Sequence, residues 1–163
     1  LAEAPAPATR KIALRITMVF GDAGGVFPVL RRLARLGLGG RMGSGRQFVS
    51  WIHINDFLGA VEWLLAQADF SGPVNLAAPN PLPNAEMMRL LRETVGVPIG
   101  LPATAWMLEV GAVFLRTETE LILKSRRVVP GRLLTAGFRF QFPDLRAALE
   151  DLQNQASVST NPS

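Results

Sequence analysis

The segment of residues 11–20 constrains the fold more than any other part of the sequence. Apolar side chains occupy every second position from Ile12 to Phe20, and the positions between them carry a single charge, at Arg15. This alternation predicts a β-strand, and a strand that is largely apolar on both sides is typical of a sheet covered by helices on both faces. We therefore expect residues 12–20 to form an inner strand of an α/β sheet.

Strand-like and helix-like segments alternate along the rest of the chain, which predicts an α/β fold with a mostly helical end. A helix is predicted from Val26 to about Leu36, and Asn55 and Asn84 are favourable N-caps for two more. The helix after Asn55 should bury one face, made of Phe57, Ala60, Val61, Leu64 and Leu65. Short strands are expected over 46–54, 73–78 and 127–129, helices over 102–115, 117–125, 132–136 and 145–152, and a disordered tail over 153–163.

The composition argues against several kinds of site. Cys is absent, so disulfides and thiolate metal ligands are excluded, and a cytoplasmic location is expected. With one His in the sequence, we expect no metal site. The longest apolar run, 105–115, is interrupted by Glu109 and covers about half of the ~20 residues that a membrane span needs, so we expect no membrane segment.

The formal charge of +4 raises the question of nucleic-acid binding. Most of the basic residues are arginines scattered along the chain, and only Arg31, Arg32 and Arg35 form a local group. A solvated helix face explains that group equally well. The charge distribution therefore disfavours a nucleic-acid partner.

A glycine-rich passage, GLGGRMGSG, is the first candidate for ligand chemistry. A dinucleotide fingerprint needs G-x-G-x-x-G between a strand and a helix; here Met42 stands where the third glycine would be, and a strand follows Gly45. A substrate loop and a plain turn both stay open. An arginine beside flexible glycines can hold a phosphate or carboxylate through two parallel hydrogen bonds. The candidate substrate-binding residues are therefore Gly43, Ser44, Gly45, Arg46 and Gln47.

Catalytic residues are harder to find in this sequence. His53 could act as a general base, but a lone histidine on a strand more often satisfies a hydrogen bond in the core. Asp56 is expected in the first turn of a helix, where a carboxylate is favoured by the helix dipole. No serine lies in a nucleophile elbow, and the sequence contains no Tyr. We assign no catalytic residue and no metal ligand.

Five segments occur in order along the chain: LRITMVFG, LGLGGRMGSGRQFVSWIHINDF, SGPVNLAAPNPLPN, SRRVVPGRLLTAGFRF and FPDLRAALEDL. Together they resemble the C-terminal part of an epimerase-like family of atypical extended short-chain dehydrogenases, over nearly the whole chain to Leu152. GSGRQ followed by WIH is the most specific string. The resemblance implies late Rossmann strands and a substrate-binding portion over 1–100, and a mostly helical C-terminal cap over 101–152.

The resemblance also implies a cofactor, NAD or NADP, bound mainly by an N-terminal Rossmann half. That half would supply the glycine-rich nucleotide loop and a Tyr-x-x-x-Lys pair, and this chain has no Tyr. By analogy, Thr17, Met18 and Val19 would lie near the nicotinamide, and Arg46 near the substrate. The chain departs from the family at Asn55, where Asp is frequent, and in residues 109–123, which lack an expected Gly-Glu pair.

These expectations lead to one main hypothesis and two alternatives. The main hypothesis is a substrate-binding portion of an NAD(P)-dependent sugar-nucleotide epimerase or oxidoreductase, inactive alone, whose substrate is a small hydroxylated or nucleotide-linked molecule. The alternatives are a non-enzymatic protein-interaction module with a degenerate Rossmann-type body, and a basic nucleic-acid binder. Because an unpaired apolar strand invites association, we expect the isolated chain to dimerise, aggregate or need its missing half.

Overall fold

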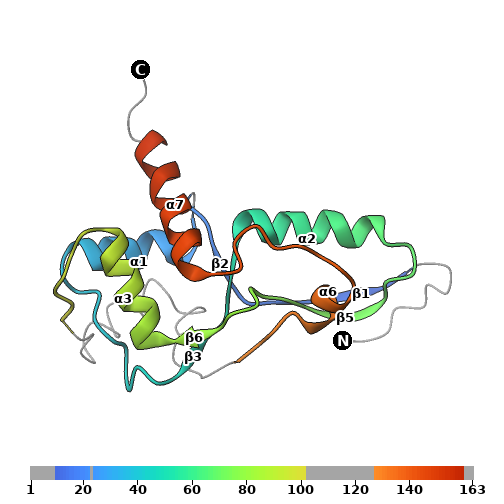
Figure 1. The fold of residues 1–163 in the computed structure, drawn as a ribbon, viewed down its shortest axis with the longest axis horizontal. Helices are drawn as coiled ribbons and strands as arrows, with labels where there is room; N and C mark the ends of the chain where they lie inside the picture. The colour runs from blue at the N-terminus through green and yellow to red at the C-terminus, as the bar shows by residue number, and fades with distance from the viewer. Residues whose placement is uncertain (1–9, 23, 102–126, 160–163) are drawn as a thin grey trace.

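The computed structural model describes residues 10–22, 24–101 and 127–159, and its described part confirms the α/β class (Figure 1). The helices predicted over 102–115 and 117–125 lie outside the described residues. In chain order the elements are β1 (Ile12–Ile16), β2 (Met18–Phe20), α1 (Val26–Arg35), β3 (Phe48–Val49), β4 (Trp51–His53), α2 (Ile54–Ala66), β5 (Gly72–Leu76), β6 (Leu82–Pro83), α3 (Asn84–Thr94), α6 (Gly131–Thr135) and α7 (Leu145–Ser159).

The predicted strand over 12–20 is divided at Thr17, where it changes its neighbour. β1 is parallel to β5, and β2 is parallel to β4. The backbone N–H and the hydroxyl of Thr17 both donate to the Leu76 carbonyl, at 3.1 and 2.8 Å. The next N–H, of Met18, donates to the Ser50 carbonyl at 3.3 Å. Because successive backbone groups of a strand point to opposite edges, β5 and β4 lie on opposite edges of this segment.

Burial differs sharply between the two halves of that segment. Met18 and Phe20 are buried, but Leu14 is 38% and Ile16 is 50% exposed. The expectation that the whole strand is covered on both faces is therefore wrong for β1 within the described residues. β1 pairs only with β5 there, so its other edge has no strand from the described part of the chain.

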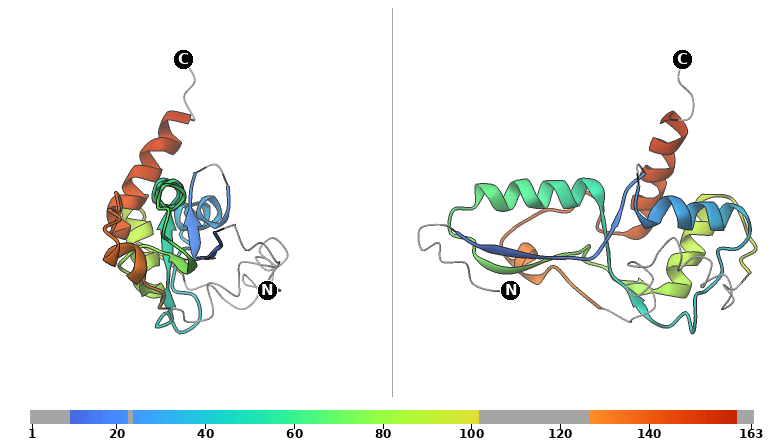
Figure 2. Two further views of the ribbon diagram at one scale, coloured as in Figure 1. Left: turned by 90° about the vertical axis from the view of Figure 1, so that its right-hand side faces the viewer. Right: turned by 180° about the vertical axis from the view of Figure 1, so that it is seen from behind.

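Two apolar clusters hold the described elements together. One lies where α1, α3 and α7 meet β2, and the other lies between α2, β5 and α6 (Figures 1 and 2). Trp51 belongs to the first cluster and the adjacent Ile52 to the second, since neighbouring side chains of a strand point to opposite faces. β4 therefore contributes to both clusters.

Both predicted asparagine caps are wrong, Asn55 by two positions and Asn84 by one. The N-cap of α2 is His53, whose Nδ1 accepts a hydrogen bond from the Asn55 N–H at 3.1 Å. An imidazole nitrogen thus takes the role expected of a carboxamide oxygen. Asn84 is the first residue of α3, after Pro83, and its side-chain oxygen accepts a hydrogen bond from the Met42 N–H at 2.8 Å. Its side chain is therefore committed to the preceding loop.

Three other features differ from the sequence predictions. Leu65, expected on the buried face of α2, is 72% exposed. Residues 127–129 form no strand. α7 continues to Ser159, so residues 153–159 are helical and not part of a disordered tail; the amide of Gln155 donates to the Asp151 carboxylate one turn earlier, at 2.6 Å. The division into portions 1–100 and 101–152 stays a prediction.

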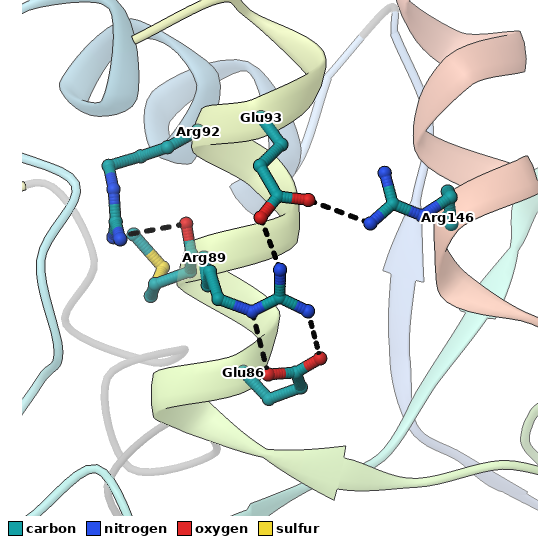
Figure 3. Close-up of polar contacts among 6 residues, drawn as sticks. Glu86, Arg89, Arg92, Glu93 and Arg146 are labelled. Carbon is teal, nitrogen blue, oxygen red and sulfur yellow. Dashed lines mark hydrogen bonds and ion pairs between the residues drawn. The ribbon is translucent and has the colours of Figure 1, made fainter. Parts of the chain in front are cut away.

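Ion pairs on the surface connect α3 with α7 (Figure 3). Arg89 contacts Glu86 and Glu93 on its own helix, and Arg146 of α7 donates to Glu93 at 2.7 Å. The hydrogen bond from Arg146 is the main reason why the pKa of Glu93 lies below its ordinary value. Because these side chains are exposed, salt screens the network and its contribution to stability is small.

Candidate functional site

A cavity of about 520 Å³ lies where β1 gives way to β2. Residues 15–18, where β1 ends and β2 begins, form one wall, and Ser50, Asn75 and residues 127–129 form the others. Thr17 and Met18, two of the three residues expected near the cofactor, line this cavity. Val19 instead lines a second cavity, of about 500 Å³, beside the glycine turn that precedes α1.

Segments far apart in the sequence form the first cavity. The Val128 N–H donates to the Ser50 hydroxyl at 2.8 Å, and the Asn75 amide donates to the Val129 carbonyl at 3.2 Å. The Arg127 guanidinium carbon lies 5.2 Å from the centre of the Phe48 ring, within the range of a cation–π contact. These contacts place residues 127–129 against β3 and β5, although they form no strand.

The charge of this cavity is unbalanced. Arg15 and Arg127 both line it, and the described lining residues include no Asp or Glu. The described residues contain no grouping of three or more metal-ligating side chains. Chemically, the cavity can therefore attract a carboxylate or a phosphate.

The loop of residues 43–47 forms a tightly held turn. Gly43 and Gly45 have positive φ angles of 56° and 70°. Gln47 is 9% exposed; its amide donates to the Met42 carbonyl at 2.7 Å and accepts from the Ser44 hydroxyl at 3.1 Å. The backbone N–H of Ala85, in α3, donates to the Gly45 carbonyl at 2.9 Å. Several hydrogen-bonding groups of this loop are thus already bonded within the chain.

Arg46 is the exposed basic side chain of this loop. Neither cavity beside β2 is lined by any of the five loop residues. The structure therefore does not bring the expected substrate-binding residues together with Thr17, Met18 and Val19. The roles of both groups stay predictions.

His53 and Asp56 attach α2 to the C-terminal part of the chain. His53 is fully buried, and because Nδ1 accepts the Asn55 N–H, the ring carries its proton on Nε2, 3.3 Å from an Asp151 oxygen in α7. The two oxygens of Asp56 accept the backbone N–H groups of Gln141 and Phe142, at 2.7 and 2.9 Å. This geometry supports the structural interpretation of both side chains. No local pattern in the sequence indicates these partners.

Acid should weaken this attachment. Burial lowers the pKa of His53 from its ordinary 6.5, against the opposing influence of Asp151 and Asp56. The unfolded chain then takes up a proton that the folded protein resists, so the free energy of unfolding should fall as the pH drops below about 6.5. Urea unfolding across a pH series measures this. His53→Asn, which can still cap α2, should flatten the slope above the range of carboxylate titration; an unchanged slope would contradict the assignment.

Comparison with known proteins identifies relatives of this chain. Residues 103–152 match the family model "Domain of unknown function (DUF1731)". The chain is 38% identical over 152 residues to the epimerase family protein SDR39U1 of Bos taurus, covering 93% of this chain and 51% of that protein. It is also 38% identical over 142 residues to the epimerase family protein Mb2239 of Mycobacterium bovis, covering 86% and 46%. The chain is a relative of the epimerase family proteins.

Solved structures support the same relationship. The crystal structure of human epimerase family protein SDR39U1 (isoform 2) with NADPH matches with a TM-score of 0.83 and 34% identity, over 93% of this chain and 51% of that one. A nucleoside-diphosphate sugar epimerase from Corynebacterium glutamicum matches with a TM-score of 0.65 and 28% identity, over 94% and 30%. The epimerase-like resemblance and the Rossmann-like fold class are thus confirmed. The chain spans about half the length of the curated epimerase family proteins it matches.

None of the helices in the described ranges combines the length and apolar character that crossing a membrane requires.

Proposed function

We propose that this chain is the substrate-side, C-terminal portion of an NAD(P)-dependent epimerase-like oxidoreductase. Its relatives are named epimerase family proteins, and the human one was solved with NADPH. In the proposed protein, a nucleotide-binding portion outside these 163 residues supplies the pyrophosphate loop and the Tyr-x-x-x-Lys pair.

The open edge of β1 carries this proposal. The backbone groups on this edge have no strand partner in the described part of the chain, and Leu14 and Ile16 are exposed beside it. An exposed apolar strand with unpaired N–H and C=O groups is a template for another strand. A nucleotide-binding portion that continues the parallel sheet there would satisfy these groups.

The residues of this chain do not themselves fit a dinucleotide. The sequence has no Tyr, and the glycine-rich passage after Gly37 leads into β3 instead of a helix. Thus no catalytic step is assigned to this chain. We propose that Thr17, Met18 and Val19 lie near the nicotinamide, and that the loop containing Gly43, Ser44, Gly45, Arg46 and Gln47 contacts the substrate through Arg46.

NADPH binding tests this function. We expect the longer protein to bind NADPH in a fluorescence titration, and the 163-residue chain alone to show no saturable binding. In the longer protein, Leu14→Glu with Ile16→Glu should weaken NADPH binding at least about tenfold, or ~1.4 kcal/mol, because charges would replace buried apolar contacts.

Leu36→Glu is the matched control, since Leu36 is also exposed (63%) but is the C-cap of α1 and lines neither cavity beside β2. Equal NADPH binding by the chain alone and the longer protein would refute the proposal. Absence of binding by the longer protein would favour the interaction-module alternative.

A further inference from the structure

Asn84 is a fully buried polar side chain at the junction of β6 and α3. Its side-chain oxygen accepts the Met42 N–H, and this bond decides which end of the carboxamide faces the preceding loop. Its amide nitrogen is buried without a hydrogen-bond partner in the described part of the chain. Because a buried donor without an acceptor is destabilising, stability alone does not explain an asparagine at this position.

The Met42 N–H belongs to a residue at which the loop of residues 43–47 closes. The Met42 carbonyl accepts hydrogen bonds from the Gly45 N–H at 3.1 Å and from the Gln47 amide at 2.7 Å. Both sides of the Met42 backbone are therefore bonded, the carbonyl to the loop and the N–H to Asn84. Removing the Asn84 oxygen would release the residue on which the loop depends.

The same loop also satisfies the start of α3. No side chain of the described residues caps this helix; instead, the N–H groups of Asn84 and Ala85 donate to the carbonyls of Gln47 and Gly45, both at 2.9 Å. The antiparallel pairing of β3 with β6 brings the two segments together (Figure 1). A Cβ at Gly45 would lie 3.0 Å from that of Ala85, so the loop packs directly on the helix. The loop and the first turn of α3 form one hydrogen-bonded unit.

Arg46 is the residue of this unit whose side chain is available to a ligand. It is exposed, and no carboxylate pairs with it in the described ranges. Its backbone N–H donates to the Ser44 hydroxyl at 3.3 Å, and both of its neighbours, Gly45 and Gln47, are bonded to α3. A binding group on a fixed backbone loses less conformational entropy on binding than one on a mobile loop. Holding the loop should therefore strengthen the grip of Arg46 on a phosphate or carboxylate.

We propose that Asn84 is a positioning residue: by accepting the Met42 N–H, it fixes the loop so that Arg46 meets the substrate in one orientation. The inference rests on the proposed function, which assigns the substrate contact to Arg46. It adds a buried residue of another element that acts through the loop and does not touch the substrate. Asn84→Asp keeps the acceptor, removes the unpartnered donor and places a carboxylate where the α3 dipole favours one, so it should preserve the loop.

Hydrogen exchange in the longer protein tests the hold on the loop without any ligand. Asn84→Ala should speed amide exchange over residues 42–47 at least about tenfold, and Asn84→Asp should not. Asn84→Ser, whose hydroxyl is one atom too short to reach Met42, replaces Asn84→Ala if the alanine variant does not fold. Asn80→Ala is the matched control and should leave exchange unchanged, because the Asn80 amide donates to Asp144 and Pro143 instead of the loop.

Binding of nucleotide-linked sugars tests the consequence for Arg46. The probes are UDP-glucose, GDP-mannose and dTDP-glucose, whose diphosphates suit a guanidinium, titrated by calorimetry into the NADPH-bound longer protein. Arg46→Ala and Asn84→Ala should each weaken probe binding at least about tenfold, and the double substitution should be no weaker than Arg46→Ala alone, because Asn84 acts through Arg46. Asn84→Asp should restore probe binding, and NADPH affinity should stay the same throughout.

Several outcomes would overturn the positioning role and leave the proposed function standing. Probe binding could be weakened by Arg46→Ala but not by Asn84→Ala, the two effects could add independently, or Asn84→Asp could fail to restore both slow exchange and binding. Probe binding that Arg46→Ala leaves unchanged, or no binding of any of the three probes, would refute the proposed substrate contact of Arg46 and the positioning role with it.

Discussion

Replacing Asp56 with alanine should lower the free energy of unfolding by about 3 kcal/mol, since hydrogen bonds to a charged group each contribute roughly 1.5–3 kcal/mol. The residue is 1% exposed, and its carboxylate accepts the N–H groups of both Gln141 and Phe142. The substitution leaves both donors without their partner. It also removes an acid from the first turn of α2, where the helix dipole favours it.

Urea denaturation of the longer protein with and without the substitution measures this loss. The free energy of unfolding of Asp56→Asn should lie between those of the unchanged protein and Asp56→Ala, because a carboxamide has one acceptor oxygen where the carboxylate has two. Asp69→Ala, at an exposed position, is the control and should change stability by no more than about 0.5 kcal/mol. An equal effect at positions 56 and 69 would show that the contact with residues 141 and 142 adds little.

Replacing Trp51 with alanine should be still more damaging, by about 3–5 kcal/mol, as for other buried aromatic residues truncated to alanine. Trp51 is fully buried, and its ring stacks on that of Phe20, with centroids 6.0 Å apart. The indole N–H donates to the Asn80 carbonyl at 3.3 Å. The substitution therefore removes apolar packing, an aromatic pair and a hydrogen bond together.

Thermal and urea unfolding, followed by circular dichroism, give the size of this loss. Leu65→Ala is the control, because it truncates a large apolar side chain that is 72% exposed. Its effect should stay near zero. If Trp51→Ala were as mild as this control, the packing of Trp51 in the first cluster would contribute little to stability.

The local elements of the fold follow from local patterns. Alternating side chains predict most of the strand segments, and 3.6-residue spacing with N-cap residues predicts the starts of α1, α2 and α3 to within about two residues. The division at Thr17 is not predictable in this way, because it depends on the Leu76 carbonyl, 59 residues away. The same limit applies to the α2 cap, where His53 replaces the expected Asn55.

The candidate site was partly predictable, through the family resemblance more than through residue chemistry. Thr17 and Met18, expected near a cofactor by analogy, line the first cavity, and their proximity to a cofactor stays a prediction. Arg127 was missed as a lining residue because its segment reaches the cavity through the contact between Val128 and Ser50, 78 residues apart. Its loop carries no motif that would reveal such a contact, whereas the glycines around Arg46 drew attention to a different loop.

The wide separation of Thr17 and Leu76 in the sequence also matters before the protein is complete. A ribosome that adds about 5–20 residues per second would release β1 roughly 3–12 seconds before its partner, β5, emerges. During that interval β1 lacks its partner strand β5, and strands of other nascent chains can pair with the free edge. The speed of translation through the codons for these 59 residues, and the binding of chaperones to the nascent chain, would therefore influence how much of the product folds correctly.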